Sequence, residues 1–248
     1  MIELEVMKVE GIVIGEVNYS ESSKILKVLT RDYGVISVMS KGCRNLKSKL
    51  RGVSSKFSYG DFHLYYKENG ISTLVAVDIK NSFRNILMNI DNISYATYLL
   101  DLVEQVSKHS NDKELFSNLV NTLIKIDEGY DVRVLTNILE LKMLDFLGIR
   151  PVIDGCSICG SSKKIVTIDP TSGGYICQEC YHNEKIYNEK TIKLIRMFYY
   201  VDISKITKLD VHDDIKKEIN EFIDLYYDRY SGLYLKSKVF LKNLSKIG

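Results

Sequence analysis

The chain has 248 residues, of which 45% are hydrophobic and 27% are charged, and its formal net charge is only +2 at pH 7. Such a composition is typical of a globular protein and excludes a disordered chain, a fibrous repeat and an integral membrane protein. No apolar run approaches the roughly 18 residues needed to span a bilayer, and the first residues lack the basic start and apolar run of a signal peptide, so we expect a cytoplasmic protein.

The first 80 residues predict short β-strands and no helix. Apolar and polar side chains alternate, as in half-buried strands, over residues 7–17, 24–29, 35–39, 62–66 and 71–79. Turn signals separate these segments, and the Asn69-Gly70 pair before the last one is typical of a hairpin. We predict a five-stranded barrel of the OB type, although an SH3-like barrel would give a similar pattern.

A flexible cationic loop is expected between the third and fourth predicted strands. It contains no Asp or Glu between Lys41 and Lys56, and its candidate phosphate-binding residues are Lys41, Arg44, Lys47, Lys49 and Arg51. Cations in such a loop neutralise phosphates and release counterions, while Ser and Gly residues allow phosphate oxygens to approach. A merely solvated loop is the alternative on charge alone. The lone Cys43 is expected to be a bystander.

After residue 81 the apolar spacing changes to three or four residues, which predicts helices. One is expected around residues 93–106, and Asn111 with Glu114 resembles a capping box at the start of a second. A third should run over about residues 131–147 and end at Gly148, and helices are also expected after residue 188, around 215–226 and over 233–244. We therefore predict an α+β protein with a helical domain behind the barrel.

Four cysteines form two CxxC pairs, Cys156 with Cys159 and Cys177 with Cys180, separated by seventeen residues. This spacing is typical of a zinc ribbon, in which two thiolate pairs close a tetrahedron around the ion. Four sulfur ligands leave no open position, so we predict a structural zinc site between short strands at residues 165–168 and 174–176. Redox-active or incidental thiols are the alternative, and His182 is a weak rival to Cys180 as a ligand.

These patterns divide the chain into four expected segments. They are an OB-fold DNA-binding domain at 1–80, a first helical part at 81–150, a zinc-binding insertion at 151–186 and a C-terminal helical part at 187–248. No Walker loop, GxGxxG, HExxH or GxSxG motif is present, so we do not expect an enzyme.

The N-terminal sequence resembles the signature of the RecO family of DNA repair and recombination proteins. The resemblance rests on residues 10–14, 19–22, 29–35, 40–44 and 48–52, and it extends through residues 147–151, the CxxC pairs and residues 235–237. It implies a non-enzymatic mediator that binds single-stranded and double-stranded DNA, anneals strands, and helps to load RecA together with RecR and single-strand binding protein. Association with the nucleoid when bound to DNA follows from the same resemblance.

The resemblance also suggests further DNA and protein contacts. Lys24 and Arg31 are weaker phosphate-binding candidates on adjoining strand ends. Base stacking is expected to be weak, because the barrel offers mainly Tyr59, Phe62, Tyr65 and Tyr66, which alternation places partly in the core. The acidic, apolar-ended tail of single-strand binding protein is expected in a groove of the C-terminal half, near Lys193, Arg196, Lys216 and Lys217.

Three other classes of protein share parts of this pattern. A zinc-ribbon or OB-type protein that binds RNA or associates with transcription would have the same barrel, loop and cysteines, and a preference for RNA would identify it. ATPase or nuclease activity would identify an enzyme. A scaffold whose loop binds only a protein would show no salt-dependent affinity for DNA.

Overall fold

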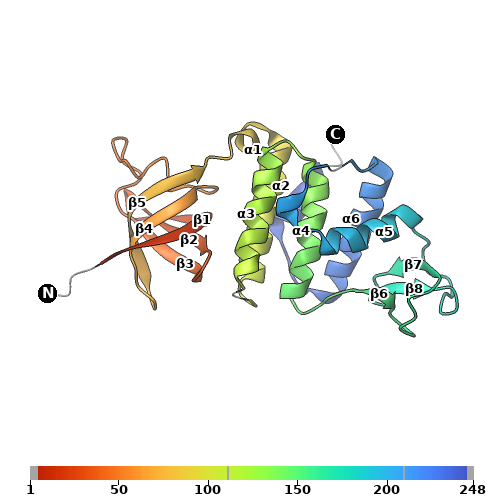
Figure 1. Cartoon of the computed structure of the whole chain (residues 1–248). Helices are drawn as coiled ribbons and strands as arrows, with labels where there is room; N and C mark the ends of the chain where they lie inside the picture. The colour runs from red at the N-terminus through yellow and green to blue at the C-terminus, as the bar shows by residue number, and fades with distance from the viewer. Residues whose placement is uncertain (1–4, 111, 209, 245–248) are drawn as a thin grey trace.

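The structure is a computed structural model that describes residues 5–110, 112–208 and 210–244. Three regions follow one another along the molecule (Figure 1): a β-barrel, a bundle of helices, and a small sheet at the far end from the barrel. Within the described residues, no helix has the length and apolar character that crossing a membrane requires.

The barrel is closed, with the strand order β1-β2-β3-β5-β4. Its strands are β1 (Val6–Tyr19), β2 (Ser23–Thr30), β3 (Gly34–Ser40), β4 (Tyr59–Tyr65) and β5 (Ile71–Asn81). All neighbouring pairs are antiparallel except β3 and β5, which pair in parallel over three residues. The prediction of a five-stranded OB-type barrel is confirmed, with strand ends that differ from the predicted ones by a few residues.

Alternation along the strands builds the interior of the barrel. Val13, Leu26, Val38 and Leu64 point inward and are fully buried, whereas their neighbours in sequence are more exposed or meet the helices. The long strand β1 changes register between Val13 and Gly15. Such a bulge bends a strand, and β1 is thereby able to pair with both β2 and β4.

The helical region is predicted correctly in outline. Its helices are α1 (Arg84–Met88), α2 (Ile90–Val106), α3 (Lys113–Asp127), α4 (Val132–Phe146), α5 (Glu189–Tyr200), α6 (Asp213–Tyr230) and α7 (Lys236–Leu244), with the 3-10 helix η1 (Ile203–Lys205). The short elements α1 and η1 were not predicted. The last helix begins three residues later than expected.

Side-chain caps help to set where the helices begin, as α3 and α4 show. The predicted cap Asn111 lies outside the described residues, and the N-cap of α3 is Asp112, whose carboxylate accepts a hydrogen bond from Glu114 N. Asp131 caps α4 in the same way. That helix ends before Gly148, which has a φ of +70° and so takes the left-handed conformation that favours glycine.

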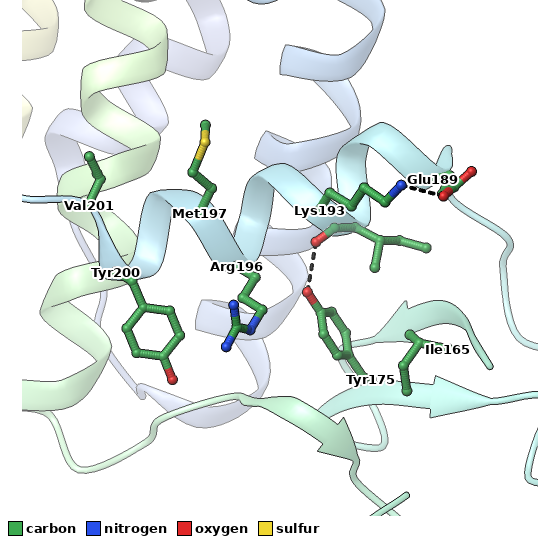
Figure 2. Close-up of a pocket in the computed structure, with 9 residues that line it drawn as sticks. Ile165, Tyr175, Glu189, Lys193, Arg196, Met197, Tyr200 and Val201 are labelled. Carbon is green, nitrogen blue, oxygen red and sulfur yellow. Dashed lines mark hydrogen bonds and ion pairs between the residues drawn. The ribbon is translucent and has the colours of Figure 1, made fainter. Parts of the chain in front are cut away.

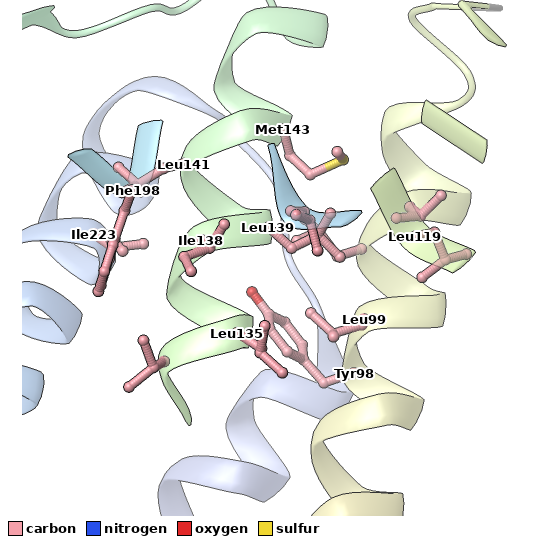
Figure 3. Close-up of a cluster of buried hydrophobic side chains, with 14 of the residues drawn as sticks. Tyr98, Leu99, Leu119, Leu135, Ile138, Leu139, Leu141, Met143, Phe198 and Ile223 are labelled. Carbon is pink, nitrogen blue, oxygen red and sulfur yellow. The ribbon is translucent and has the colours of Figure 1, made fainter. Parts of the chain in front are cut away.

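The core of the bundle surrounds α4, against which α2, α3, α5 and α6 pack (Figure 3). Leu135, Ile138 and Leu139 of this helix are fully buried. The same apolar cluster continues into the barrel, where it includes Ile12 and Tyr59. These barrel side chains therefore join the core of the helices, while the barrel interior forms an apolar cluster of its own.

The small sheet has the order β6-β8-β7, with β6 (Val152–Cys156), β7 (Ile165–Asp169) and β8 (Gly174–Cys177). The strands β7 and β8 were predicted and form an antiparallel pair. The third strand, β6, was not predicted, and it runs parallel to β8.

Candidate nucleic-acid interface and metal centre

The cationic loop between β3 and β4 is a series of tight turns. Hydrogen bonds recur every three residues, from Asn45 N to Gly42 O (3.1 Å), from Ser48 N to Asn45 O (3.1 Å) and from Arg51 N to Ser48 O (3.2 Å). The loop that we expected to be flexible is therefore held by its own backbone.

The loop is also anchored to the barrel. The fully buried hydroxyls of Ser40 and Ser54 share a hydrogen bond of 2.7 Å. Backbone hydrogen bonds join Val13 in β1 to Phe57 and Ser58 at the end of the loop (3.0 and 2.9 Å). Cys43 is 2% exposed, so its thiol packs inside the loop.

Five loop cations project from this framework, namely Lys41, Arg44, Lys47, Lys49 and Arg51, and all five are exposed. No carboxylate among the described residues forms an ion pair with any of them. Since there is no internal counter-charge, these cations remain available for phosphates. Arg44 also contacts the β1–β2 hairpin, because its guanidinium donates to Ser20 O at 3.3 Å.

The two weaker candidates lie in different surroundings. Lys24 Nζ is 2.9 Å from Glu16 Oε1 and donates to Ser54 O at 3.2 Å. Lys24 therefore links β2 to the end of the loop. Arg31 Nε donates to Glu10 Oε2 at 2.6 Å, and its guanidinium lies 5.1 Å from the ring centroid of Phe116 in α3. The structure thus brings Lys24 next to the loop and places Arg31 at the junction with the helices.

The aromatic candidates are mostly internal. Phe62 is fully buried and Tyr59 is 8% exposed, with its hydroxyl donating to Glu10 at 2.7 Å. Tyr65 and Tyr66 are half-buried. Two exposed apolar side chains, Leu46 in the loop and Tyr19 at the end of β1, were not among the predicted DNA-binding residues. Leu46 could have been found from sequence, because it is an apolar residue between the cations Arg44 and Lys47. Tyr19 could not, because its exposure depends on where the β1–β2 hairpin ends.

The four cysteines of the CxxC pairs come together in the small sheet. Their Sγ atoms all lie within 4.8 Å of one another, and Cys159 Sγ is 3.6 Å from Cys177 Sγ. Tetrahedral zinc with sulfur at 2.3 Å would separate the sulfurs by about 3.8 Å. These four residues therefore can hold a metal ion, and His182 is not part of the cluster.

Each CxxC pair is a tight turn at the end of a strand. Gly160 N donates to Cys156 O at 2.8 Å after β6, and Cys180 N donates to Cys177 O at 3.1 Å after β8. Glycine is needed beside the first pair, because a Cβ on Gly155 would lie 2.6 Å from Gly160 O, and Gly160 itself has a φ of +77°. The two turns, with glycine at these positions, therefore bring the four thiols close together.

The thiols differ in how easily they ionise. Burial alone would raise the pKa of the Cys156 thiol, but N–H groups of Cys159, Cys177 and Ile158 lower it to about 6. Contact with Cys159, together with burial, raises the pKa of the Cys180 thiol to about 12. A thiolate disfavours ionisation of a neighbouring thiol, because the two negative charges repel. A bound cation would compensate these charges and so allow all four cysteines to be thiolates together.

A groove of about 660 Å³ lies between α5 and the small sheet (Figure 2). Its lining includes Ile165 and Tyr175 of the sheet and Lys193, Arg196, Met197 and Tyr200 of α5. Arg196 and Tyr200 project from α5 towards the sheet (Figure 2). Met197 and Tyr200 remain 50% and 48% exposed. A groove is thus present beside Lys193 and Arg196, and it is formed by α5 and the sheet. Lys216 lies elsewhere, in ion pairs with Asp131 and Asp213.

Known proteins resemble this chain over nearly its whole length. Residues 1–83 match the family described as recombination protein O N terminal, and residues 87–239 match recombination protein O C terminal. A protein named DNA repair protein RecO from Listeria innocua is 36% identical over 243 residues, which cover 96% of this chain and 95% of that protein. Proteins with the same name from Halalkalibacterium halodurans and Bacillus pumilus are 37% and 34% identical, covering 97% of this chain and 96% and 95% of their own.

Proposed function

Because the chain belongs to the RecO family of DNA repair and recombination proteins, we propose that it is a recombination mediator that binds single-stranded and double-stranded DNA through the cationic loop of its barrel. In this role it anneals complementary strands and, together with RecR and single-strand binding protein, helps RecA to load. It works in the cytoplasm, at the nucleoid when bound to DNA, and it performs no catalysis of its own.

The observation that supports this proposal is the ordered loop with its five exposed loop cations. Its turns keep neighbouring charges on a fixed backbone, so several cations can meet successive phosphates without first ordering the loop. Contacts with phosphates do not depend on sequence. Affinity for DNA of any sequence is what a mediator requires.

The direct test removes Lys47, Lys49 and Arg51 together by substitution with Ala. The affinity for single-stranded DNA should fall about equally for all sequences. The slope of log affinity against log salt should become shallower by about 2, since each neutralised phosphate contributes about 0.7 for single strands. Fluorescence anisotropy at several salt concentrations measures both quantities, and RNA of the same sequence tests the RNA-binding alternative.

A matched control removes three exposed lysines elsewhere, Lys163, Lys190 and Lys217. This variant has the same net charge as the loop variant and should keep the parental slope. If the loop variant is folded and binds with parental affinity and salt dependence, the loop is not the DNA site.

We also propose that the metal held by Cys156, Cys159, Cys177 and Cys180 is zinc, and that it is structural. Four sulfur donors at tetrahedral spacing suit Zn²⁺ and leave no position open for water or substrate. When bound, the ion would link the turns that follow β6 and β8. Its contribution is to the fold of the small sheet.

For the protein partner we propose that the groove between α5 and the small sheet accepts the tail of single-strand binding protein. Its lining combines the apolar side chains of Met197 and Ile165 with the cations Lys193 and Arg196. Both cations are in ion pairs, with Glu189 and Asp154, that an acidic peptide would have to replace. A tail peptide should bind at low salt, and Met197→Asp should abolish that binding. Absence of binding to the parent protein would refute the assignment.

A further inference from the structure

Leu46 is an apolar side chain held at the surface among the loop cations. It is 85% exposed and lies between Arg44 and Lys47 in sequence. The turn from Asn45 to Ser48, closed by a hydrogen bond of 3.1 Å, places it at the second position. The backbone therefore presents Leu46 at a fixed point of the loop, with a cation on either side.

Tyr19 is a second exposed apolar side chain, at the tip of the β1–β2 hairpin. It is the last residue of β1, pairs with Ser23, and is 52% exposed. Three hydrogen bonds fasten this tip to the loop: Arg44 N to Ser22 O (2.8 Å), Arg44 Nη1 to Ser20 O (3.3 Å) and Gly42 N to Ser23 Oγ (3.1 Å). The hairpin tip and the loop are thus one continuous surface.

An apolar row continues from Tyr19 across the outside of the barrel. The register aligns Val17 of β1 with Ile25 of β2, and Ile25 with Met39 of β3. These side chains point outward, because Leu26 and Val38, their neighbours in sequence, are fully buried inside. Val17 is 61% exposed. In OB folds the face of the second and third strands and the loop between the first two are common sites for oligonucleotides.

We propose that Tyr19 and Leu46 form a base-contacting edge for single-stranded nucleic acid beside the loop cations. This inference rests on the proposed function and adds contacts with bases to contacts with phosphates. The ring of Tyr19 offers a stacking face, which every base can use. Leu46 is an apolar wedge that enters between neighbouring bases, as leucine does in proteins that unstack DNA. The loop cations hold the phosphates on either side.

Two DNA strands of equal length separate base contacts from phosphate contacts. One is a labelled deoxythymidine homopolymer, and the other has the same phosphates but abasic sites throughout. The parent protein should bind the base-bearing strand more tightly. In the double variant Tyr19→Ala, Leu46→Ala this preference should fall by about 5-fold to 150-fold, the range found for removing one stacked contact. Its affinity for the abasic strand and its salt slope should not change.

Matched controls test whether exposure alone explains the effect. Met88 and Tyr234 are 86% and 77% exposed, and both lie outside the barrel. The double variant Met88→Ala, Tyr234→Ala should therefore keep the preference for bases. Tyr19→Phe keeps the ring and should also keep it. Leu46→Ala alone, at an exposed turn, should lower the preference even if the Tyr19 substitution disturbs the hairpin.

The results distinguish this inference from the proposed function. If the parent shows no preference for the base-bearing strand, or if the folded double variant keeps the parental preference, the base edge is refuted while DNA binding by the loop stands. If the variant lacking Lys47, Lys49 and Arg51 keeps its salt slope but Tyr19 and Leu46 matter, the phosphate assignment is wrong and the base edge stands. If the parent binds neither strand, both fail.

Discussion

At the level of single residues, Glu10 organises the junction between the barrel and the helices. Its carboxylate accepts from Arg31 (2.6 Å) and Tyr59 (2.7 Å) and lies 3.0 Å from Lys80 Nζ. Burial alone would raise the pKa of Glu10, but the hydrogen bonds from these three residues lower it to about 2. Arg31 in turn lies over Phe116, so the charged Glu10 holds a residue that contacts both regions.

Glu10→Gln should lower the free energy of unfolding at neutral pH by about 1–3 kcal/mol, since it weakens partly buried charge-assisted hydrogen bonds. A depressed pKa stabilises the fold above the unfolded value of 4.5, and this contribution is lost as the pH falls towards about 2. The difference between parent and variant should therefore shrink between neutral pH and about pH 3. Urea unfolding followed by circular dichroism measures it, and an equal difference at both pH values would contradict the prediction.

Some of these residues can be identified from sequence and others cannot. The metal cluster was predictable, because each CxxC pair is a local turn and the spacing between the pairs suits a hairpin. The loop cations were recognisable as a run without acidic residues. The pairing of Arg31 with Glu10 was not, since it depends on strand register, and the contact with Phe116 joins residues from different regions.

At the level of elements, the metal site should determine whether the small sheet folds. The double variant Cys156→Ser, Cys177→Ser should lose the one zinc expected per chain and should unfold the sheet, because metal binding and folding are coupled. The helices should lose stability too, as Tyr175 of β8 donates to Ile192 O in α5 at 2.8 Å. Metal analysis and thermal unfolding measure these effects.

Cys43→Ser is the matched control for the metal prediction, because it removes a lone thiol outside the cluster. It should retain one zinc per chain. Freshly purified parent protein without zinc, or a double variant with parental helical stability, would show that the site is not a structural zinc site.

A half-buried lysine, Lys238, links the helix α7 to charged residues of the bundle. Lys238 Nζ lies 2.7 Å from Glu140 Oε1 and 2.6 Å from Asp224 Oδ1, between the rings of Tyr98 and Tyr227. Glu140 is 1% exposed. Lys238→Met should lower the free energy of unfolding by about 3–5 kcal/mol, because it leaves the Glu140 carboxylate buried without this ammonium group.

Lys236→Met is the control on the same helix, since Lys236 is exposed. It should change stability by no more than about 0.5 kcal/mol. Denaturant unfolding of both variants measures the difference. Equal stability of the two variants would show that the ion pairs of Lys238 do not stabilise the fold.

Long periodic elements were predicted from sequence, and short ones were not. The apolar spacing identified α2, α3 and α4 because each spans several turns, whereas α1 has five residues and η1 three, too few to show a period. Strand β6 was missed for a different reason. It exists through its parallel pairing with β8, where Gly174 approaches Val152 so closely that a Cβ would lie 2.1 Å from its carbonyl oxygen.

At the level of the whole molecule, one apolar cluster joins the barrel to the helices. It contains Ile12, Ile14 and Tyr59 from the barrel together with Phe83 and Phe116. Because this cluster packs the two regions against each other, we expect them to unfold as one cooperative unit. We therefore predict one unfolding transition, with coincident curves from far-UV circular dichroism and from tyrosine fluorescence, which is usable because the chain has no Trp.

Phe116→Ala tests the apolar cluster that joins the barrel to the helices. It should lower the free energy of unfolding by about 3–5 kcal/mol, as expected for a buried aromatic residue, and it should keep a single transition. Two separate transitions in the parent protein would show that the barrel and the helices unfold independently. The segment boundary at residue 80 would then separate two units that unfold independently.

Sequence patterns predicted the barrel, the helices and the ribbon, but not their arrangement. The position of the small sheet at the far end from the barrel (Figure 1) depends on which face of α4 each later helix covers. Periodicity identifies an apolar face without identifying its partner. For the same reason the groove beside α5 was expected against α6 and was found against the sheet.

The parallel pairing that closes the barrel has a kinetic consequence. Only Ser37, Val38 and Met39 of β3 align with β5, and parallel pairs are slightly weaker per residue than antiparallel ones. The β3–β5 pair should therefore open before the other strand pairs of the barrel. The amide hydrogens of this pair should then exchange for deuterium first. Since β3 runs at Ser40 directly into the cationic loop, a bound strand that steadies the loop should slow deuterium uptake at residues 37–39.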